Sequence, residues 1–595
     1  MRYSVLADAY EKLEATTKRL EMHDILVELF RQTPKDVVDK VVYLTQGKLH
    51  PDWMGMPEIG VAERMAVRAL AMATGSTEGQ VESKFKELGD MGLVAEELMK
   101  NKRIMKLFSQ PLTVERVYKT LDQIAMESGP GSVDRKIRRL VGLLGDASPK
   151  EAKYLMRTVL GSLRIGVGDM TVLDALAEAY TGSKENRPLL ERAYNLTSDL
   201  GYVARVVAEK GLEGISGIKP VLGKPIRMML AQRLSSAEEI VEKLNGMCAA
   251  EYKLDGERMQ IHKKGDEVWI FSRRLENITH MYPEVVEMAR SQIKVEEAIV
   301  EGEGVAYDPN TGELRPFQEL MRRRRKYKIE EMMKEIPVSV FLFDCLYVDG
   351  KDLTVEPYPV RREWLSKVVE ETDTFKLTPQ LVTNDPAALE SFFDKAVSEG
   401  CEGLVVKSTS QESIYRAGAR SWLWVKLKRS YQSKMIEPVD LVVVGAFMGR
   451  GRRAGTYGAL LVAAYDHEAD VFRTVCKVGS GFTDEELKAL PEKLKPYRIP
   501  HRHARVDSIL EADVWFEPKV VIEVIGDEIT LSPVHTCALG AVRKGSGLAI
   551  RFPRFTGRWR LDKGPEDATT VKEILDMYRA QLRRIEEAAP QPSET

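Results

Sequence analysis

The sequence predicts three successive domains: an all-helical domain at residues 1–225, a mixed α/β domain at 226–430, and a small β-barrel with a C-terminal helix at 431–595. The 595 residues exceed what one core supports, because single cores stop growing at about 250 to 300 residues. Helical patterns fill the first third of the chain. Beyond a Pro- and Gly-rich stretch at 220–250, short β-rich runs alternate with helices.

The helical domain begins with an amphipathic pattern in which Leu6, Tyr10, Leu13, Thr17 and Leu20 recur at helical spacing. This spacing, together with the acid at Asp8, argues against a signal peptide. Further along, Ser148 and Glu151 have the spacing of a capping box around Pro149. We therefore expect helices with short polar joints up to residue 225.

The two later domains show strand patterns. In the α/β domain the expected strands are EYKLDGERMQIH, EVWIFSRR, EAIVEGEGVAY, SVFLFDCLYVDG and EGLVVK. In the last domain, five short strands with Gly-rich connections indicate a barrel: DLVVVGAF, GALLVAAYD, VFRTVCKVG, KVVIEVIGDEIT and GLAIRFPRF. A closing helical stripe consists of Val571, Leu575, Tyr578, Leu582 and Ile585.

Composition excludes several classes of protein. With 44% hydrophobic and 30% charged residues the chain is neither disordered nor embedded in a membrane, and apolar runs such as LVVVGAF are far shorter than the roughly 20 residues that span a bilayer. We expect a cytoplasmic protein. Its five cysteines form no CxxC pair, so we expect core residues and neither disulfides nor zinc. The net charge of −2 means that binding of nucleic acid would depend on local basic clusters.

Lys253 stands in EYKLDGER, before an Asp255-Gly256 turn and the run Met259–Ile261, which resembles a half-buried strand. A KxDG match alone is weak, since a lysine at a strand end is usually just solvated. Further charged motifs recur at expected strand ends or turns, and the set is more specific than any member: FSRR at 271–274, EGE at 301–303, EGLVVK at 402–407 and WVKLK at 424–428.

This set supplies what covalent nucleotidyl transfer needs. A lysine with the ordinary pKa of about 10.4 is protonated and inert, and lowering that pKa by about 3 units requires roughly 4 kcal/mol from desolvation or nearby positive charge. The same cations would stabilise a phosphoryl group in transfer. Candidate cations are Arg258, Lys407, Lys426 and Lys428, while Glu402 and Glu303 could hold a divalent metal or a ribose hydroxyl.

The ordered motifs resemble those of the ATP-dependent DNA ligases, in the layout of the archaeal replicative type, over nearly the whole chain: EYKLDGER, FSRRLENIT, VEGEGVAY, FLFDCLYVDG, EGLVVK, WVKLKRSY and FTGRWRLDKGPEDATT. The resemblance implies a helical DNA-binding domain, a nucleotidyltransferase (adenylation) domain and an OB-fold barrel. It also implies an enzyme that seals 5′-phosphate/3′-hydroxyl nicks in duplex DNA with ATP and Mg²⁺ during replication, repair and recombination. The intermediates would be a covalent lysyl-AMP and a DNA-adenylate.

The resemblance also assigns residues. Lys253 would carry AMP, Glu251 would recognise the adenine amino group, and Phe343 would stack on the base. Glu303 would bind the ribose, and Glu402, with Glu303 as a further metal candidate, would carry Mg²⁺. The remaining assignments place Arg258 and Arg273 on the nucleotide phosphate or the nick, Lys407, Arg420, Lys426 and Lys428 along the phosphates, and Arg560 and Lys563 in closure over ATP. Relatives often have Asp-Gly-Glu where this chain has Glu301-Gly302-Glu303, which leaves the role of Glu301 open.

Several interpretations remain open at this stage. Phe343 could be plain core, and Glu402 with Lys407 an exposed ion pair of little value. The turn Gly166-Val167-Gly168, before a helix expected near Thr171, fits a DNA phosphate contact or an ordinary interhelical turn. The basic run at 322–328 fits DNA phosphates or a solvated helix face.

Partners and rival functions complete the expectations. The stretch KRIMKLFSQ at 102–110 lies where some archaeal ligases carry a sliding-clamp peptide, although a buried amphipathic helix explains it equally well. We otherwise expect a monomer that binds nicked double-stranded DNA. An RNA ligase or GTP-using capping enzyme shares the KxDG chemistry, but the helical first third and the RxDK ending argue against both. A catalytically silent DNA-binding scaffold is opposed by retention of every charged motif.

Overall fold

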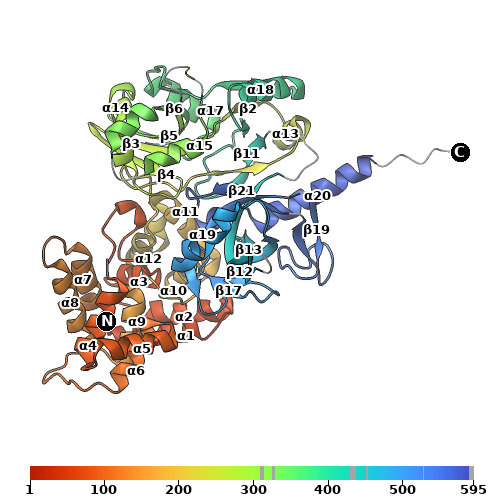
Figure 1. Cartoon of the computed structure of the whole chain (residues 1–595). Helices are drawn as coiled ribbons and strands as arrows, with labels where there is room; N and C mark the ends of the chain where they lie inside the picture. The colour runs from red at the N-terminus through yellow and green to blue at the C-terminus, as the bar shows by residue number, and fades with distance from the viewer. Residues whose placement is uncertain are drawn as a thin grey trace. The chain divides into compact units, whose positions relative to one another are not determined.

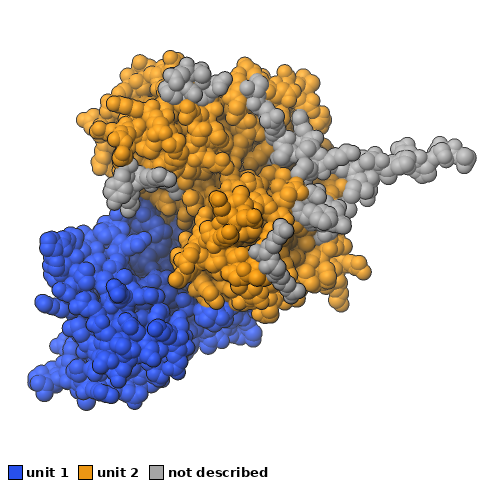
Figure 2. All heavy atoms as spheres, in the orientation of Figure 1, with its two compact units in different colours: residues 1–194, 199–218, 500–505 blue, residues 195–198, 219–499, 506–595 orange. Residues whose placement is uncertain are grey.

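The computed structural model describes residues 1–307, 312, 314–324, 328–428, 437–449, 453–526, 528–551 and 553–588. The chain forms two compact units, coloured blue and orange in Figure 2. Unit 1 contains residues 1–194, 199–218 and 500–505, and unit 2 contains 195–198, 219–499 and 506–595. The predicted boundary between residues 430 and 431 lies outside the described residues.

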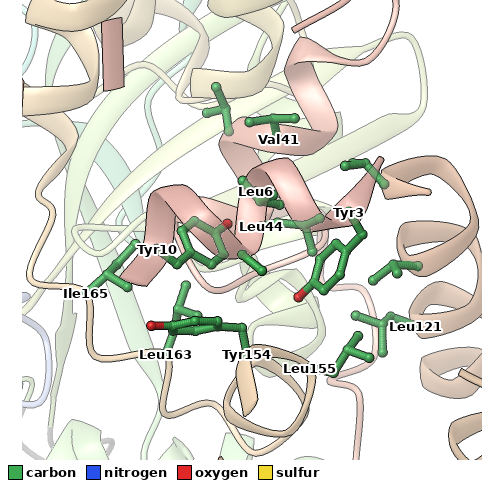
Figure 3. Packing of buried hydrophobic residues seen from close by; sticks show 14 of the residues in the cluster. Tyr3, Leu6, Tyr10, Val41, Leu44, Leu121, Tyr154, Leu155, Leu163 and Ile165 are labelled. Carbon is green, nitrogen blue, oxygen red and sulfur yellow. The ribbon is translucent and has the colours of Figure 1, made fainter. Parts of the chain in front are cut away.

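Unit 1 is built from helices, as predicted. Its core is continuous, and Figure 3 shows the side chains of Tyr3, Leu6 and Tyr10 packing with those of Leu44 and Tyr154. The Tyr10 and Tyr154 rings meet edge to face with centroids 5.6 Å apart. The α-helices of unit 1 (Figure 1) are α1 (Tyr3–Glu14), α2 (Arg19–Gln32), α3 (Val38–Thr45), α4 (Glu63–Thr74), α5 (Glu78–Leu88), α6 (Met91–Lys100), α7 (Val114–Met126), α8 (Ser132–Asp146), α9 (Pro149–Val159), α10 (Asp169–Thr181), α11 (Arg187–Thr197, whose last three residues belong to unit 2) and α12 (Leu200–Ser216).

Two helix boundaries test the sequence patterns. The capping box is confirmed, since Ser148 Oγ accepts from the Glu151 amide (3.2 Å) and the Glu151 carboxylate accepts from the Ser148 amide (2.8 Å). The single N-terminal stripe is wrong beyond Leu13, because α1 ends at Glu14, α2 starts at Arg19 and Leu20 is 70% exposed. The β-branched residues at 16 and 17 have low helix propensity, which favours a break there.

The first half of unit 2 contains two sheets. A five-stranded sheet has the order β1-β11-β10-β2-β9, and a second sheet has the order β4-β3-β5-β6-β7 with β8 also paired to β6. Met259, Gln260 and Ile261 all have 0% exposure, so the predicted half-buried strand is buried on both faces. The strands are β1 (Leu230–Arg233), β2 (Cys248–Lys253), β3 (Glu257–Lys264), β4 (Glu267–Ser272), β5 (Glu297–Ala306), β6 (Val338–Val348), β7 (Lys351–Asp352), β8 (Phe375–Leu377), β9 (Gln380–Thr383), β10 (Gly403–Ser408) and β11 (Arg420–Lys428).

Helices pack against these sheets and bury a separate core on each. They are α13 (Ala237–Leu244), α14 (Pro283–Gln292), α15 (Phe317–Leu320), α16 (Ile329–Glu335), α17 (Tyr358–Val368) and α18 (Pro386–Ser398). The predicted α/β character of this region is therefore present.

The last part of unit 2 contains a further eight-stranded sheet, a separate β19-β20 hairpin and two helices. The expected strand KVVIEVIGDEIT divides into two strands of different sheets, and GLAIRFPRF also divides, with Pro553 between the parts. Proline cannot donate to a strand ladder, which explains the second break. The elements are β12 (Val439–Met448), β13 (Tyr457–Asp466), β14 (Val471–Val478), α19 (Asp484–Leu494), β15 (Arg498–Ile499), β16 (Val506–Asp507), β17 (Val514–Phe516), β18 (Val521–Ile525), β19 (Glu528–Ser532), β20 (Gly547–Arg551), β21 (Arg554–Trp559) and the predicted C-terminal helix α20 (Val571–Ala588).

Two chemical expectations were tested by the fold. All five cysteines are buried free thiols, which confirms that they are core residues. Among the described helices, none has the length and apolar character needed to cross a membrane.

Candidate active site

A pocket in unit 2 brings all the predicted site residues together, although they come from segments separated by about half the chain. Its lining includes Glu251, Lys253, Arg258, Arg273, Glu303, Phe343, Glu402, Lys407, Arg420, Lys426, Lys428, Arg560 and Lys563. Strand pairing explains most of this convergence, since β2, β10 and β11 are neighbours in one sheet and β3, β5 and β6 in the other.

Lys253 and Glu402 are placed together by the antiparallel pairing of β2 with β10. Lys253 lies opposite Gly403, and the Glu402 amide donates to the Lys253 carbonyl (2.8 Å). Their side chains form an ion pair, with Lys428 Nζ 3.7 Å from the same carboxylate. Burial opposes ionisation of Glu402, but Lys253, Lys428 and Arg558 outweigh it and hold the pKa of Glu402 well below its usual value. The alternative of an exposed Glu402–Lys407 pair is therefore wrong.

Lys407 instead lies at the Glu251 end of the pocket. Its Nζ is 2.7 Å from Glu251 Oε2, both side chains are 2% exposed, and burial lowers the pKa of Lys407. The amine also lies 4.7 Å from the Phe343 ring centre and 4.3 Å from that of Trp424. Phe343 is only partly buried and meets Trp424 edge to face, so it is a pocket wall and not plain core. This end of the pocket combines aromatic surface with one acceptor and one donor.

Arg258 and the acids of EGE form the adjoining wall. Arg258 lies opposite Glu303 in the β3-β5 pairing, and its guanidinium is 3.2 Å from the carboxylate of Glu301. Glu301 is 0% exposed and also accepts from the Tyr415 hydroxyl. The role left open for Glu301 is therefore to hold Arg258. Burial raises the pKa of Glu303 to about 8, against the opposing effect of Lys253 and Arg258.

Further cations line the pocket from β11. Burial lowers the pKa of Lys426 well below its usual value, and Arg233, which sequence reasoning missed, adds to this effect. Arg420 Nε is 2.7 Å and Arg233 Nε 2.9 Å from the carboxylate of Glu573 in α20. Glu573 of the C-terminal helix therefore fixes both Arg420 and Arg233.

The segment after β21 contributes the last side chains. Arg560 pairs with Asp562 (2.9 Å), and Lys563 forms an ion pair with Asp440 of β12. Sequence reasoning did not single out Arg558 for the site, yet its guanidinium is 2.6 Å from Asp255 and 3.2 Å from Glu402. Its position two residues before RLDK was the available signal. Arg558 therefore binds two acids near Lys253 that precede it by 303 residues (Asp255) and 156 residues (Glu402).

The acids fit a magnesium ion only in part. No group of three or more His, Cys, Asp or Glu side chains suited to a metal exists among the described residues. The raised pKa of Glu303 favours its protonated form at neutral pH, which makes it a poor ligand. Glu402 remains ionised and reaches the pocket. This fits an ion held by one carboxylate together with phosphate oxygens of a bound nucleotide, a frequent arrangement for Mg²⁺.

The glycine turn of unit 1 has a definite place. Helix α10 begins at Asp169, two residues before Thr171, with Gly168 as its N-cap, so the predicted helix start after this turn is confirmed. Gly166 has φ +69°, and a Cβ there would lie 2.4 Å from the Cβ of Ala504, so glycine is required for both backbone conformation and close packing. The phosphate-contact role of this turn remains a prediction.

The structure also bears on the two basic segments at 322–328 and 102–110. Arg323 is buried, pairs with Glu284 and lies 4.8 Å from the ring centre of Tyr282, so this member of the run at 322–328 is structural. Residues 325–327 lie outside the described residues. The stretch 102–110 contains no helix, and Leu107 and Phe108 are 96% and 91% exposed. The interpretation as a buried amphipathic helix is therefore wrong.

Comparisons with known proteins cover the whole chain. Three family descriptions match: DNA ligase N terminus at residues 2–177, ATP dependent DNA ligase domain at 228–428, and ATP dependent DNA ligase C terminal region at 453–563. The DNA ligase of Staphylothermus marinus is 55% identical over 99% of this chain and 100% of its own length. DNA ligase 2 of Thermofilum pendens is 58% identical over 98% of both chains, and a probable DNA ligase of Aquifex aeolicus is 53% identical over 98% of this chain and 99% of its own.

Solved structures give weaker matches. A mycobacterial DNA ligase D complexed with ATP and MES is 23% identical, with a TM-score of 0.33, over 58% of this chain and 98% of its own. A structure titled Pmar-Lig_Pre is 16% identical, with a TM-score of 0.43, over 94% of this chain and 99% of its own.

Proposed function

The chain belongs to the family of ATP-dependent DNA ligases, and from this premise we propose that it seals 5′-phosphate/3′-hydroxyl nicks in duplex DNA through a lysyl-AMP on Lys253 and then a DNA-adenylate. The observation that supports this most directly is the position of Lys253 at the end of β2, in a pocket lined by cations and ion-paired to Glu402. The sealing would serve replication, repair and recombination.

The proposed reaction has three steps, of which the first two transfer the AMP phosphoryl group and the third transfers the DNA 5′-phosphoryl group. Lys253 Nζ attacks the α-phosphorus of ATP and pyrophosphate leaves; the DNA 5′-phosphate then attacks the phosphorus of lysyl-AMP and frees the lysine. In the third transfer the 3′-hydroxyl attacks the DNA 5′-phosphorus and AMP leaves. Each step needs in-line geometry and neutralisation of phosphate charge, for which Arg258, Arg273, Lys426 and Lys428 line the pocket.

The nucleotide is proposed to lie with its base at the Glu251 and Phe343 end of the pocket and its ribose at Glu303. Its phosphates would extend toward Arg420 and the lysines of β11, with Arg560 and Lys563 closing over them. Mg²⁺, bound by Glu402 and phosphate oxygens, would supply further charge neutralisation. Because Lys407 pairs with Glu251, its assignment to the phosphates is the one we revise: we place it beside the base.

The three domains proposed from the sequence are 1–225, 226–430 and 431–595. The family matches at 2–177, 228–428 and 453–563 support this division, and we propose an OB-fold barrel for the third domain. The helical domain would grip duplex DNA, with the backbone amides at the start of α10 contacting phosphate.

The exposed stretch 102–110 supports a sliding clamp as a further partner. Leu107 and Phe108 expose nearly all of their apolar surface, which a monomeric protein rarely does without a binding role. A double replacement, Leu107→Ser with Phe108→Ser, should abolish co-elution with the clamp and leave nick sealing without a clamp unchanged. Unchanged co-elution would exclude this stretch as the docking peptide.

The function is tested by supplying ATP, GTP or NAD alone, each labelled in its adenylyl or guanylyl group, together with nicked DNA whose sealing is followed by strand length. We expect sealing with ATP and a covalent protein–AMP adduct that Lys253→Ala and Lys253→Arg both lack, because guanidinium stays protonated and cannot attack. An adduct that persists in either variant would contradict the assignment of Lys253. A wild-type protein that binds DNA without acquiring label would instead be a scaffold.

A further inference from the structure

Two side chains outside the motif strands hold the carboxylate of Glu251. Tyr358 and Arg362 both come from α17, which lies between β7 and β8 of the second sheet in the chain. The Tyr358 hydroxyl lies 2.5 Å and Arg362 Nη1 3.0 Å from Glu251 Oε1. Neither α17 residue lines the pocket, whereas Glu251 does. Tyr358 and Arg362 therefore contact the Glu251 carboxylate from outside the pocket lining.

Each of these donors is itself fixed. Gln380 Nε2 donates to the Tyr358 oxygen (2.9 Å), which leaves the single phenolic proton for Glu251. Burial and the nearby Glu251 charge raise the pKa of Tyr358 well above its usual value, so the phenol keeps that proton. Arg362 Nη2 donates to the Thr378 carbonyl (2.7 Å), which directs Nη1 at Glu251. Oε1 thus has two preoriented donors, and rotation of the carboxylate is restricted.

The other carboxylate oxygen differs. Among the described residues, Oε2 accepts no hydrogen bond of regular geometry, and it is buried. Its closest cation is Lys407 Nζ at 2.7 Å, and that amine also donates to the Phe343 carbonyl (3.3 Å). Both Oε2 and Nζ have hydrogen-bonding capacity left. The pocket therefore carries a fixed acceptor next to a fixed donor, beside the Phe343 ring.

This order of groups distinguishes two purines. Adenine presents an amino donor at N6 next to an acceptor at N1, whereas guanine presents an acceptor at O6 next to a donor at N1. Oε2 would accept from the adenine amino group and Lys407 would donate to N1. With guanine both positions would face a group of the same kind, and a site built for hydrogen bonding rejects such a ligand strongly because its buried groups stay unpaired.

We propose that Tyr358 and Arg362 are positioning residues that set the choice of adenine over guanine nucleotides, by fixing Glu251 so that Oε2 and Lys407 present an acceptor and a donor to the base. The inference rests on the proposed function, because it concerns the nucleotide that Lys253 attacks. A carboxylate free to rotate, or a shifted Lys407, would lose this order of groups.

The experiment measures formation of the covalent protein–nucleotide adduct with labelled ATP and with labelled GTP in the full-length protein. Tyr358→Phe removes only the hydroxyl, and Arg362→Gln removes the charge. Arg362→Lys keeps the charge but replaces the two nitrogens that bond Glu251 and Thr378 with a single one. Tyr347→Phe is the matched control, since its hydroxyl bonds the carboxylate of Glu297 (3.1 Å) and it does not line the pocket.

We expect the ratio of kcat/KM for ATP to that for GTP to fall about tenfold or more in Tyr358→Phe and in Arg362→Gln, mainly through a higher KM for ATP. Arg362→Lys should lose less. Sealing of a nick that already carries AMP uses no free nucleotide and should stay within about twofold of wild type, as should all rates of the control.

Equal losses with ATP and GTP, or an unchanged ratio in Tyr358→Phe, would overturn the proposal. Because Tyr358→Phe preserves side-chain shape, it decides the question even if Arg362→Gln fails to fold. Failure of the underlying function is a separate result, in which wild-type protein acquires no label from any nucleotide.

Discussion

Replacement of Glu303 by Gln should change how stability depends on pH. The folded-state pKa of Glu303 is about 8, compared with an ordinary value of 4.5, because burial disfavours its ionised form. Between these two values the folded protein retains a proton that the unfolded chain has released. The free energy of unfolding therefore falls as pH rises through this window, by linkage. Below the window both states are protonated, and above it both are ionised and the penalty is complete.

The size of the effect follows from the same pKa difference. Its upper limit is about 5 kcal/mol, at about 1.4 kcal/mol for each pKa unit. Glu303 is only partly buried by its exposed area and lines an open pocket, so water reduces the penalty, and we expect about 2 to 3 kcal/mol. Glutamine has no charge to desolvate and should escape the penalty.

The assay is urea unfolding of both proteins at pH 5, 6, 7, 8 and 9, followed by tryptophan fluorescence. The free energy of unfolding of Glu303→Gln minus that of wild type should rise between pH 5 and about pH 8 and then level off. Glu267→Gln, at an exposed position on β4, is the matched control and should show no such rise. A difference for Glu303→Gln that is constant across this range would show that Glu303 is ionised throughout in the folded protein, and the reasoning would be refuted.

Three further predictions concern closure, DNA binding and the core. Replacing both Arg560 and Lys563 by Ala should slow protein–AMP formation about 100-fold more than sealing of a pre-adenylated nick, since only the first step expels pyrophosphate. Equal losses of rate in both reactions would rule out a role of these residues in closure over ATP. The affinity of the protein for nicked duplex DNA should fall steeply as the salt concentration rises, because contacts to phosphates release counterions. This should hold although the net charge of the protein is −2. A fragment of residues 1–225 whose affinity does not depend on salt would contradict the DNA-binding role of that region. Arg361→Ala should lower the free energy of unfolding by about 3 to 5 kcal/mol, because it leaves the fully buried carboxylate of Asp344 unpaired. For Arg361, a urea-unfolding loss under about 1 kcal/mol would be the contrary result.

Much of the local structure was predictable because its causes are local. The capping box at Ser148 needs only residues three apart, and the C-terminal helix follows from its apolar spacing. The predictions failed where the same local pattern was compatible with more than one structure. The stripe through Leu20 was interrupted by a break between α1 and α2, and the fully buried run Met259–Ile261 resembled a half-buried strand because Gln260 is polar. Gln260 is buried because its amide bonds both backbone groups of Ile226.

The sequence by itself determined most of the charged side chains that line the pocket, although not Arg233 or Arg558, because charged residues in a fixed order at strand ends and turns are informative without knowledge of their contacts. The tertiary structure alone decided their partners. Glu301 holds Arg258, Lys407 lies beside Glu251, and Arg558 reaches Asp255 across 303 residues of chain. The physical reason is that sheet register and helix packing, which depend on many weak contacts between distant segments, set these distances. No short stretch of sequence encodes them.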